Sequence, residues 1–314
     1  MTRPRLAVTL GDPRGIGPEI VAKMLRDGRA SRDATLVLVG PAGTEVDVTE
    51  SVGTWRAGAE PALAGKMAGA AIERAVSLAC EGVVDGIVTA PIDKSVLLSG
   101  GYDYPGHTEM LAALTRSRVA MMLTSADGGN RPLPSSALRV VLATTHIPLA
   151  DVTRTLTRER IIEIAATTRR ALREWFHVAE PRIALCALNP HGGDHGRFGR
   201  EDDDVLAPAA REANLSGPFP ADTVFVRALR GEFDAVIAPY HDVGMTAIKV
   251  AAFGRAVNVT LGLPFPRCSP DHGTALDISG RGIANASSMI EATLLCASIA
   301  RSIKKDSRAR TSIH

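Results

Sequence analysis

The 314-residue sequence is short of aromatic side chains and of cysteine, and it carries no large excess of charge of either sign. Aromatic residues make up 4% of the chain, which argues against the stacked platforms that bind single-stranded nucleic acid. The balance of 36 Lys and Arg against 34 Asp and Glu gives neither a basic field nor an acidic tail. No apolar run reaches membrane-spanning length, and no secretion signal precedes the first strand-like segment, residues 6–10. We therefore expect a cytoplasmic protein without nucleic-acid or membrane partners.

The cysteines and the common catalytic motifs argue against further classes of protein. Cys80, Cys186, Cys268 and Cys296 are scattered, with no pair at Cys-x-x-Cys spacing, so we expect reduced, buried thiols. The chain has no Gly-x-Ser-x-Gly nucleophile elbow and no His-Glu-x-x-His zinc motif. We interpret the acidic run at residues 201–204 as the start of a helix, where carboxylates favour the helix dipole, rather than as a second metal site.

Strand-like and helix-like segments alternate along the chain, in which 45% of residues are hydrophobic. Short apolar runs predict strands at residues 6–10, 36–39, 86–89, 120–124, 138–143, 183–188, 235–238 and 256–261. Apolar residues at helical spacing predict helices at residues 18–25, 64–80, 107–114, 158–175, 204–213, 221–230 and 286–304. Thr157 is the expected N-cap of the fourth helix. This is the rhythm of an α/β protein with a largely parallel sheet covered on both faces.

The chain is long enough for two domains or for one large α/β unit. No Pro/Gly-rich linker separates two parts of it, so two domains would need the chain to cross between them more than once. Such an arrangement leaves a cleft, where a ligand site is expected. Residues 125–136 are predicted to form a loop or hairpin tip, and the basic segment 304–314 a frayed tail.

Three histidines lie in short polar stretches just after predicted strands: His146, His191 and His241. The carboxyl ends of strands are where α/β folds build their sites. Neutral imidazole is the commonest protein ligand for a transition metal, and three of them would leave positions open for substrate. We therefore predict a divalent metal held by these side chains, with three unrelated loop histidines as the alternative.

Polar and cationic residues in further stretches predict a pocket for an acidic substrate. Thr108, at the start of a predicted helix, is either an anion ligand or a simple helix cap. Lys94 can neutralise an anion, and Lys249, eight residues after the third histidine, can move a proton or bind a phosphate or carboxylate. Asn258 and Arg267 follow, and arginine suits a bidentate grip on phosphate.

Two glycine-containing segments are candidates for contact with a nucleotide. Residues 11–19, Gly-Asp-Pro-Arg-Gly-Ile-Gly-Pro-Glu, match neither the GxGxxG nor the GxxxxGK[ST] pattern, so a structural turn is favoured. Residues 271–285 suit neither a strand nor a helix, which indicates a long functional loop. In it, Asp277 can accept hydrogen bonds from a ribose diol, and its charge would repel a 2′-phosphate. A solvent loop with an Asx-turn is the alternative.

Taken together, the motifs resemble those of the 4-hydroxythreonine-4-phosphate dehydrogenase family of vitamin B6 synthesis. They stand in the family's order over nearly the whole chain: Thr-Ala-Pro-Ile-x-Lys, Gly-His-Thr-Glu, Leu-Asn-Pro-His, Pro-Ala-Asp-Thr, Tyr-His-Asp and Asp-His-Gly-Thr-Ala. The last motif, with Gly-Ile-Ala-Asn, is similar to the adenosine-binding loop of isocitrate and isopropylmalate dehydrogenases. The resemblance implies their two-domain α/β/α fold with a cleft between the domains, residues 1–125 with 255–314 forming one domain and residues 126–254 the other. It also implies a homodimer whose site borrows a residue from the partner subunit.

The resemblance further implies roles for individual residues. It implies a divalent metal (Zn, Mg or Co) bound by His146, His191 and His241. It implies a phosphorylated substrate bound by His107, Thr108, Lys249, Asn258 and Arg267. It implies NAD bound by His272, Gly273, Thr274, Asp277, Ile278 and Asn285.

Four residues beside the expected site depart from the family pattern and bear on which substrate is used. Val243 stands where glutamine is usual, Asp93 replaces asparagine, and Gly192 and Asp194 replace alanine and glutamate. The segment 125–136 also looks expanded and the region around residues 40–65 short.

We therefore expect a metal-dependent, NAD-linked dehydrogenase that oxidises and decarboxylates a phosphorylated four-carbon hydroxy acid. In pyridoxal phosphate biosynthesis the substrate is 4-hydroxythreonine 4-phosphate, our first expectation; D-threonate or D-erythronate 4-phosphate is the alternative. A Lewis-acid metal and a hydride-accepting nicotinamide suit this reaction, with Lys249 as first choice for proton transfer and Asp242 as second. A non-catalytic metabolite-binding homologue is the alternative from another class.

Overall fold

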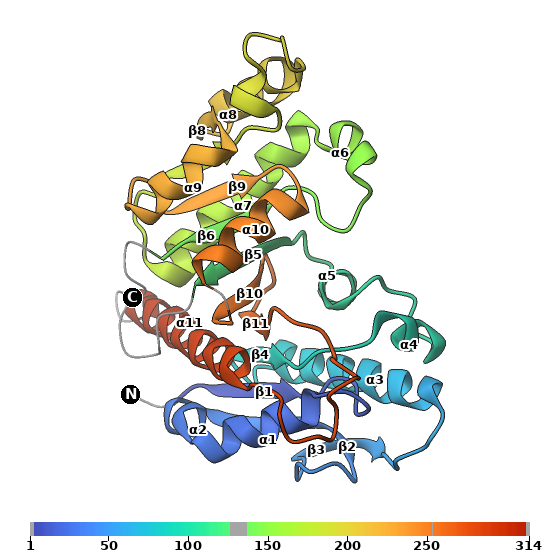
Figure 1. The fold of residues 1–314 in the computed structure, drawn as a ribbon. Coiled ribbons are helices and arrows are strands. Elements are labelled where there is room, and N and C mark those ends of the chain that lie inside the picture. The colour runs from blue at the N-terminus through green and yellow to red at the C-terminus, as the bar shows by residue number, and fades with distance from the viewer. Residues whose placement is uncertain (1–2, 126–136, 253, 312–314) are drawn as a thin grey trace. The chain divides into compact units, whose positions relative to one another are not determined.

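The computed structural model describes residues 3–125, 137–252 and 254–311 (Figure 1). The chain divides into two compact units, which we call unit 1 (Met1–Arg118 with Val257–His314) and unit 2 (Val119–Ala256). The chain therefore passes from one unit to the other twice. Of the loop or hairpin tip predicted at residues 125–136, residues 126–136 lie outside the described residues, and Ser125 is the last residue of a strand.

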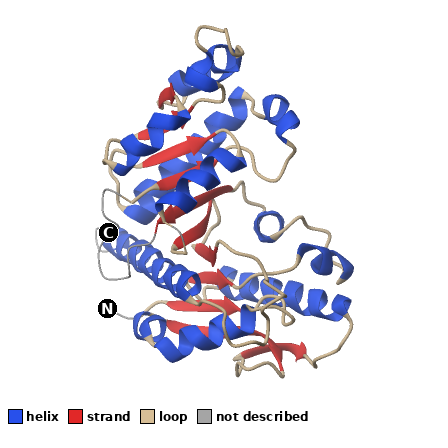
Figure 2. Cartoon of the chain, in the orientation of Figure 1, coloured by secondary structure: helices blue, strands red, loops and turns tan. Residues whose placement is uncertain are grey.

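Unit 1 is built on a mainly parallel sheet flanked by helices (Figure 2). Its described strands are β1 (Arg5–Thr9), β2 (Thr35–Ala42), β3 (Glu50–Thr54), β4 (Gly86–Thr89), β10 (Ala256–Leu261) and β11 (Arg267–Pro270), in the order β3-β2-β1-β4-β11-β10. Of these neighbours, β10 and β11 pair antiparallel and the others pair parallel. Its helices are α1 (Gly17–Asp27), α2 (Arg29–Asp33), α3 (Pro61–Cys80), α4 (Lys94–Ser99), α5 (His107–Thr115) and α11 (Ser287–Thr311).

Unit 2 repeats this plan with a smaller sheet. Its described strands are β5 (Ala120–Ser125), β6 (Arg139–Leu142), β7 (Ile183–Cys186), β8 (Ser216–Phe219) and β9 (Ala235–Ala238), in the order β5-β6-β9-β7-β8. The β5–β6 pair is antiparallel and the others are parallel. Its helical elements are α6 (Leu149–Thr155), α7 (Arg158–Phe176), the 3-10 turn η1 (Pro190–Gly193), the π turn η2 (Asp202–Leu206), α8 (Ala207–Glu212), α9 (Ala221–Leu229) and α10 (His241–Ala251).

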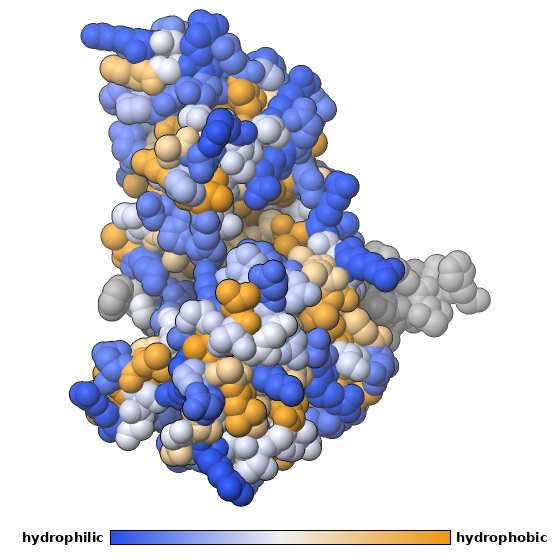
Figure 3. All heavy atoms as spheres, turned by 90° about the vertical axis from the view of Figure 1, so that its right-hand side faces the viewer, coloured by the Kyte–Doolittle hydropathy of each residue, from blue (hydrophilic) through white to orange (hydrophobic). Residues whose placement is uncertain are grey.

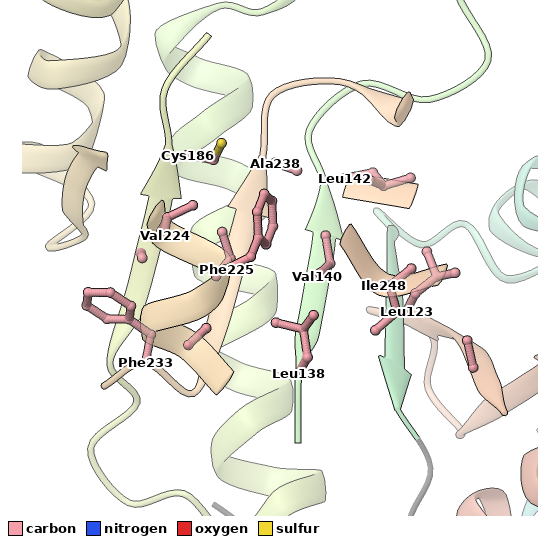
Figure 4. Close-up of a cluster of buried hydrophobic side chains, with 14 residues drawn as sticks. Leu123, Leu138, Val140, Leu142, Cys186, Val224, Phe225, Phe233, Ala238 and Ile248 are labelled. Carbon is pink, nitrogen blue, oxygen red and sulfur yellow. The ribbon is translucent and has the colours of Figure 1, made fainter. Parts of the chain in front are cut away.

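A buried apolar cluster in unit 2 holds the strands that lead into the predicted histidine stretches (Figure 4). Alternate residues of a strand point to one face, and so Val140 and Leu142 of β6 face the same cluster. Ala238 of β9, Cys186 of β7 and Ile248 of α10 join them, and all are at most 2% exposed. This packing fixes where β6, β7 and β9 end, and therefore where the segments that follow them begin.

Most of the predicted elements are confirmed. Thr157 caps α7, since its hydroxyl accepts a hydrogen bond from the backbone N–H of Arg160 at 3.3 Å. The frayed tail predicted from residue 304 is wrong up to Thr311, because α11 continues to that residue. The structure also contains elements that were not predicted: β3, β8, β11, α2, α4, α6 and α10. Most are short, and β11 reads Arg-Cys-Ser-Pro, with no apolar alternation to signal a strand.

The surface drawn in Figure 3 is largely polar, and three of the four cysteines are buried as the sequence predicted. Figure 3 shows a face on which polar residues surround smaller apolar groups. Throughout the described residues, no helix combines the length and the apolar character needed to cross a membrane. All four cysteines are free, and Cys186, Cys268 and Cys296 are buried as expected. Cys80 is exposed, because it ends α3 rather than facing the core.

Candidate functional site

Two of the three predicted metal ligands lie side by side in unit 2. His146 follows β6, and His241 follows β9 as the first residue of α10. The two strands are neighbours in the sheet, and the Thr144 hydroxyl ties their ends by donating to the Pro239 carbonyl at 2.8 Å. The imidazole centroids are 5.6 Å apart, with the rings tilted by 46°. The parallel pairing of β6 and β9 therefore brings together two imidazoles that are 95 residues apart, 241 less 146.

A carboxylate orients one of these rings. His241 Nδ1 lies 2.7 Å from Asp242 Oδ1, and the Asp242 side chain is 85% exposed. With Nδ1 engaged, Nε2 is the nitrogen left to bind a cation, as in sites where a carboxylate supports a histidine ligand. Asp242 is thus placed to orient His241.

His191 lies in a strained loop after β7. His191 has a φ of 55°, and Asp194 and His195 have φ of 45° and 56°, a left-handed conformation that non-glycine residues adopt at a cost. The buried Asp202 carboxylate holds the start of this loop by accepting from the backbone N–H groups of Leu188 at 2.8 Å and Asn189 at 2.9 Å. The acidic run does form a helical start, as predicted, but its buried member clamps the histidine loop.

His191 also lines a cavity of about 370 Å³. Asn189, Asp222, Tyr240 and Val243 are among the other lining residues, so Val243 presents an apolar wall beside His191. Within the described residues, no group of three or more His, Cys, Asp or Glu side chains is arranged to hold a metal ion. One chain therefore supplies two adjacent imidazoles, which fit part of a divalent-cation site. It does not assemble the three-histidine set.

Lys249 lies near the opposite end of α10 from His241. Eight residues of helix separate it from His241, and a rise of about 1.5 Å per residue sets the two about 12 Å apart along the axis. Lys249 lines a hollow of about 460 Å³ with Met245, Thr246 and Val250. Only a molecule several ångström long would touch both ends of α10.

A buried cation stands at the centre of the polar group in unit 1. Arg267 of β11 is 1% exposed. It donates from Nη1 to the Thr260 hydroxyl at 3.0 Å and from Nη2 to the Thr89 hydroxyl at 2.5 Å, while its Nε has no hydrogen-bond partner. Burial lowers the pKa of Arg267 to about 10, so the guanidinium stays charged at neutral pH.

Other unpaired polar atoms belong to the same predicted set. His107 Nε2 and Asn258 Oδ1 are buried without a hydrogen-bond partner. Burial lowers the pKa of His107 well below its usual value, and the charges of Arg267 and Lys94 lower it further. Buried polar atoms are nearly always hydrogen-bonded, so these unpaired ones, at the start of α5 and within β10, indicate the place of a ligand. The N-cap of α5 is Gly106, and therefore the alternative of Thr108 as the helix cap is wrong.

The glycine-containing segment after β1 supports the predicted cofactor loop. The backbone N–H of Ile16 donates to the Thr274 carbonyl at 2.9 Å, and the Ser279 hydroxyl donates to the Arg14 carbonyl at 2.6 Å. A Cβ at Gly15 would lie 2.8 Å from the Thr274 carbonyl oxygen, so the close approach requires glycine. The turn predicted at residues 11–19 is therefore also the platform of the 271–285 loop.

An ion pair on α1 anchors the far end of that loop. Lys23 Nζ donates to Glu19 at 2.8 Å, to the Gly282 carbonyl at 2.9 Å and to the Ala284 carbonyl at 2.6 Å. The buried Glu19 carboxylate accepts in turn from the Ala284 N–H at 2.8 Å. The hydrogen bond from Lys23 is the main cause that lowers the pKa of Glu19, which keeps the pair charged.

Asp93, which replaces the asparagine of the family pattern, forms an ion pair with Arg14. The Arg14 guanidinium bonds the buried Asp12 at 2.7 Å and reaches Asp93 at 3.2 Å. Asp93 also caps α4 by accepting from the backbone N–H of Ser95 and Val96. The hydrogen bond from the Ser95 hydroxyl is the main cause that lowers the pKa of Asp93, and the backbone bonds lower it further. An aspartate at position 93 therefore gives Arg14 a second charged partner that asparagine would not.

The predicted cofactor residues of the 271–285 loop differ in exposure and in hydrogen bonding. Asp277 and Gly273 are exposed, whereas His272 has Nδ1 near the Gly273 carbonyl at 3.1 Å and a buried, unpaired Nε2. The Asn285 side-chain oxygen accepts from the backbone N–H of Ser287 at 2.9 Å, at the start of α11. Asn285 can still offer its amide NH₂ and the second lone pair of the oxygen to another molecule.

Comparison with known proteins places the chain in a family. The family described as "Pyridoxal phosphate biosynthetic protein PdxA" matches residues 19–296. The chain belongs to the PdxA family. A 4-hydroxythreonine-4-phosphate dehydrogenase of Caulobacter vibrioides is 40% identical over 96% of this chain and 98% of its own. A Bradyrhizobium diazoefficiens protein, provisionally assigned as a D-threonate 4-phosphate dehydrogenase, is also 40% identical, over 93% and 95% of the two chains.

Solved structures agree with this membership. The 4-hydroxythreonine-4-phosphate dehydrogenase of Klebsiella pneumoniae superposes with a TM-score of 0.80 at 36% identity, covering 95% of this chain and 98% of its own. An isocitrate dehydrogenase of Methylococcus capsulatus shares the fold alone, with a TM-score of 0.51 at 16% identity over 98% and 89% of the two chains. The expected likeness of this chain to that class of dehydrogenases is thus confirmed for the fold.

Several contributors to the site were missed from the sequence. Thr89 was visible within the Thr-Ala-Pro-Ile-Asp-Lys motif and Asp202 within the acidic run, but neither position revealed its partner. Thr260 and Lys23 carry no sequence signal, because each acts through a segment distant in the chain.

Proposed function

We propose that this chain is a metal-dependent, NAD-linked dehydrogenase that oxidises and decarboxylates a phosphorylated four-carbon hydroxy acid. The observation that carries the proposal is the buried Arg267, whose hydrogen bonds go to neutral hydroxyls while its Nε has no partner. The hydrogen bonds of this buried charge to Thr89 and Thr260 involve no carboxylate, and a dianionic phosphate in contact with it would relieve the cost of its burial. The PdxA membership supports the same choice, and its named relatives act on 4-phosphorylated substrates.

We assign the phosphate to Arg267, His107, Asn258 and Thr108. Arginine supplies the charge and the fork geometry for phosphate oxygens, and a neutral His107 can donate one further N–H. Thr108 is in the first turn of α5, where backbone N–H groups favour anions. Lys94 lies close to this group, because its charge affects the pKa of His107, so we add Lys94 to the proposed phosphate ligands.

The reacting end of the substrate is assigned to unit 2. His146, His191 and His241 would hold the divalent metal, and His241 is already oriented by Asp242. Bound there, a Zn, Mg or Co ion supplies Lewis acidity toward the substrate hydroxyl. Because Lys249 lies about 12 Å from His241 along α10, it takes the hydroxyl proton where a second copy supplies it and otherwise binds the phosphate. Asp242 is the second candidate for proton transfer.

The 271–285 loop is assigned to NAD, whose nicotinamide is the hydride acceptor of such dehydrogenases. The residues toward the adenosine half are His272, Gly273, Thr274, Asp277, Ile278 and Asn285. The firm anchoring of this loop on residues 14–23 supports a binding role, since a preformed loop loses less entropy when it binds. The exposed Asp277 favours NAD over NADP, because its carboxylate would repel a 2′-phosphate.

We also propose a homodimer with a shared site. The described chain does not assemble three metal ligands by itself, which supports a contribution from a second copy.

The substrate is our first choice, 4-hydroxythreonine 4-phosphate, and D-threonate 4-phosphate or D-erythronate 4-phosphate is the second candidate. The second candidate is supported by Val243. This apolar side chain lines the same cavity as His191, at a position where the family pattern has a polar glutamine.

The test is a panel of the three phosphorylated acids, each with NAD or NADP and with Zn²⁺, Mg²⁺ or Co²⁺, followed by reduced-cofactor absorbance. We expect one acid to be oxidised with NAD, at a kcat/KM at least roughly tenfold above that with NADP. An NADP preference would overturn the role of Asp277. Binding of these acids without cofactor reduction in any combination would instead favour the non-catalytic homologue.

A further inference from the structure

Arg267 is held from both sides by threonine hydroxyls. Thr260 belongs to β10, the antiparallel neighbour of β11, and Thr89 is the last residue of β4, its parallel neighbour. Both threonines are 0% exposed, and they accept from different ends of the guanidinium, Nη1 and Nη2. The guanidinium group, whose two Nη atoms form a fork, therefore cannot rotate in its plane without breaking one of the two hydrogen bonds.

Two hydroxyls leave the guanidinium its charge and most of its donors. A guanidinium has five N–H groups, and the two threonines take one from each Nη. The Nε–H and one N–H on each Nη remain, and Nε has no partner among the described residues. A carboxylate in either threonine's place would occupy the fork as a bidentate pair and cancel its charge.

We propose that Thr89 and Thr260 are positioning residues that aim the Arg267 guanidinium at the substrate phosphate. This inference rests on the proposed function, because it takes Arg267 as a phosphate ligand. The threonines act through Arg267: they fix its rotamer without forming an ion pair with it, so the guanidinium can form one with the phosphate. Fixing the fork before binding reduces the entropy lost on binding, which is the general benefit of preorganisation.

The test measures phosphate affinity directly as well as turnover. T89V and T260V keep the size and branching of threonine and remove only the hydroxyl. For each, inorganic phosphate is titrated calorimetrically into the full-length protein, and KM and kcat are measured with the substrate found in the panel. We expect each variant to weaken phosphate binding and to raise KM by about tenfold, with kcat changed by less than about twofold.

T89S separates positioning from packing. It keeps the hydroxyl and loses one buried methyl, so we expect a lower Tm but a phosphate affinity and KM within about twofold of the native protein. The matched control is T293V, which removes a buried hydroxyl of α11 in the same unit that bonds the Met289 carbonyl and not Arg267. T293V should leave phosphate affinity unchanged.

R267M distinguishes failure of this inference from failure of the proposed function. If R267M loses phosphate binding while T89V and T260V retain it, the positioning role is wrong and the phosphate site stands. If R267M binds phosphate as well as the native protein, the phosphate site itself is wrong. Should T89V not fold, T260V alone decides, since it breaks the bond at the other end of the fork. Equal losses in T89S and T89V would also overturn the positioning role.

Discussion

His107 illustrates how one residue can couple the site to folding. Its imidazole Nε2 is buried and the pKa of the side chain is held well below its usual value, so the folded protein keeps it neutral. The unfolded chain binds a proton near the ordinary histidine pKa of about 6.5. Below that pH the unfolded state holds more protons than the folded state, and stability falls as the pH falls.

We therefore predict a loss of stability in acid that depends on His107. Between about pH 6.5 and pH 5, the free energy of unfolding of the native protein should fall relative to that of H107Q by up to about 1.4 kcal/mol per pH unit. Above about pH 7.5 the difference between the two proteins should be constant.

Urea unfolding at a series of pH values measures this difference. H195Q is the matched control, since it removes an exposed histidine of unit 2 by the same substitution. A pH-independent difference between native protein and H107Q would show that His107 is not held neutral.

At the scale of elements, the decisive contact is between α1 and the 271–285 loop. One lysine on α1 bonds two carbonyls of the loop, and the backbone of residues 14–16 holds its first half. Loops that bind ligands are often mobile, whereas this one is hydrogen-bonded to residues 14–23 at positions 274, 279, 282 and 284. Its ordering is thus largely complete before a cofactor binds.

We predict that K23M raises the KM for NAD by about five- to tenfold, with kcat at saturating NAD within about twofold. The reason is that the loop loses two hydrogen bonds from Lys23 while its own side chains are unchanged. Steady-state kinetics with varied NAD at fixed substrate measures the effect.

K304M provides the control for this experiment. Lys304 forms an ion pair with Asp85 at 2.7 Å in the same unit, and its charge is removed without touching the loop. An equal rise in KM for NAD in K304M, or none in K23M, would contradict the anchoring role of Lys23.

At the scale of the whole molecule, the described residues of one chain do not bring the three predicted metal ligands together. The rings of His146 and His241 are adjacent within one chain, and His191 lines a cavity with Tyr240 and Val243. A homodimer can complete such a set by exchanging one ligand between subunits.

We predict that at least one pair among H146A, H191A and H241A regains activity when the two inactive variants are unfolded, mixed and refolded together. Random pairing in a shared-site dimer restores roughly a quarter of the sites, because half of the dimers are mixed and each has one intact site. If one histidine is borrowed, both pairs that include its variant complement, so the histidine common to the two complementing pairs is the borrowed one.

Each variant refolded alone is the control and should stay inactive. Chelation of the native protein should abolish turnover, and metal should restore it. Activity that survives chelation would remove the metal from the proposal, and failure of every pair to complement would remove the shared site.

The sequence by itself determined the class of fold, the order of most elements and which motifs carry polar side chains. These are local properties: apolar periodicity selects strands and helices, and motifs such as Tyr-His-Asp and Asp-His-Gly-Thr-Ala stand next to them. Val243 and Asp93 were also visible as departures, though not what they contact.

Only the tertiary structure decided which side chains meet. The pairing of β6 with β9 joined His146 to His241, and the pairing of β4, β11 and β10 placed Thr89 and Thr260 around Arg267. These contacts depend on strand order and register, which arise from long-range packing of the whole sheet. A hydroxyl that accepts a bond from a residue 178 positions away leaves no trace in its own neighbourhood.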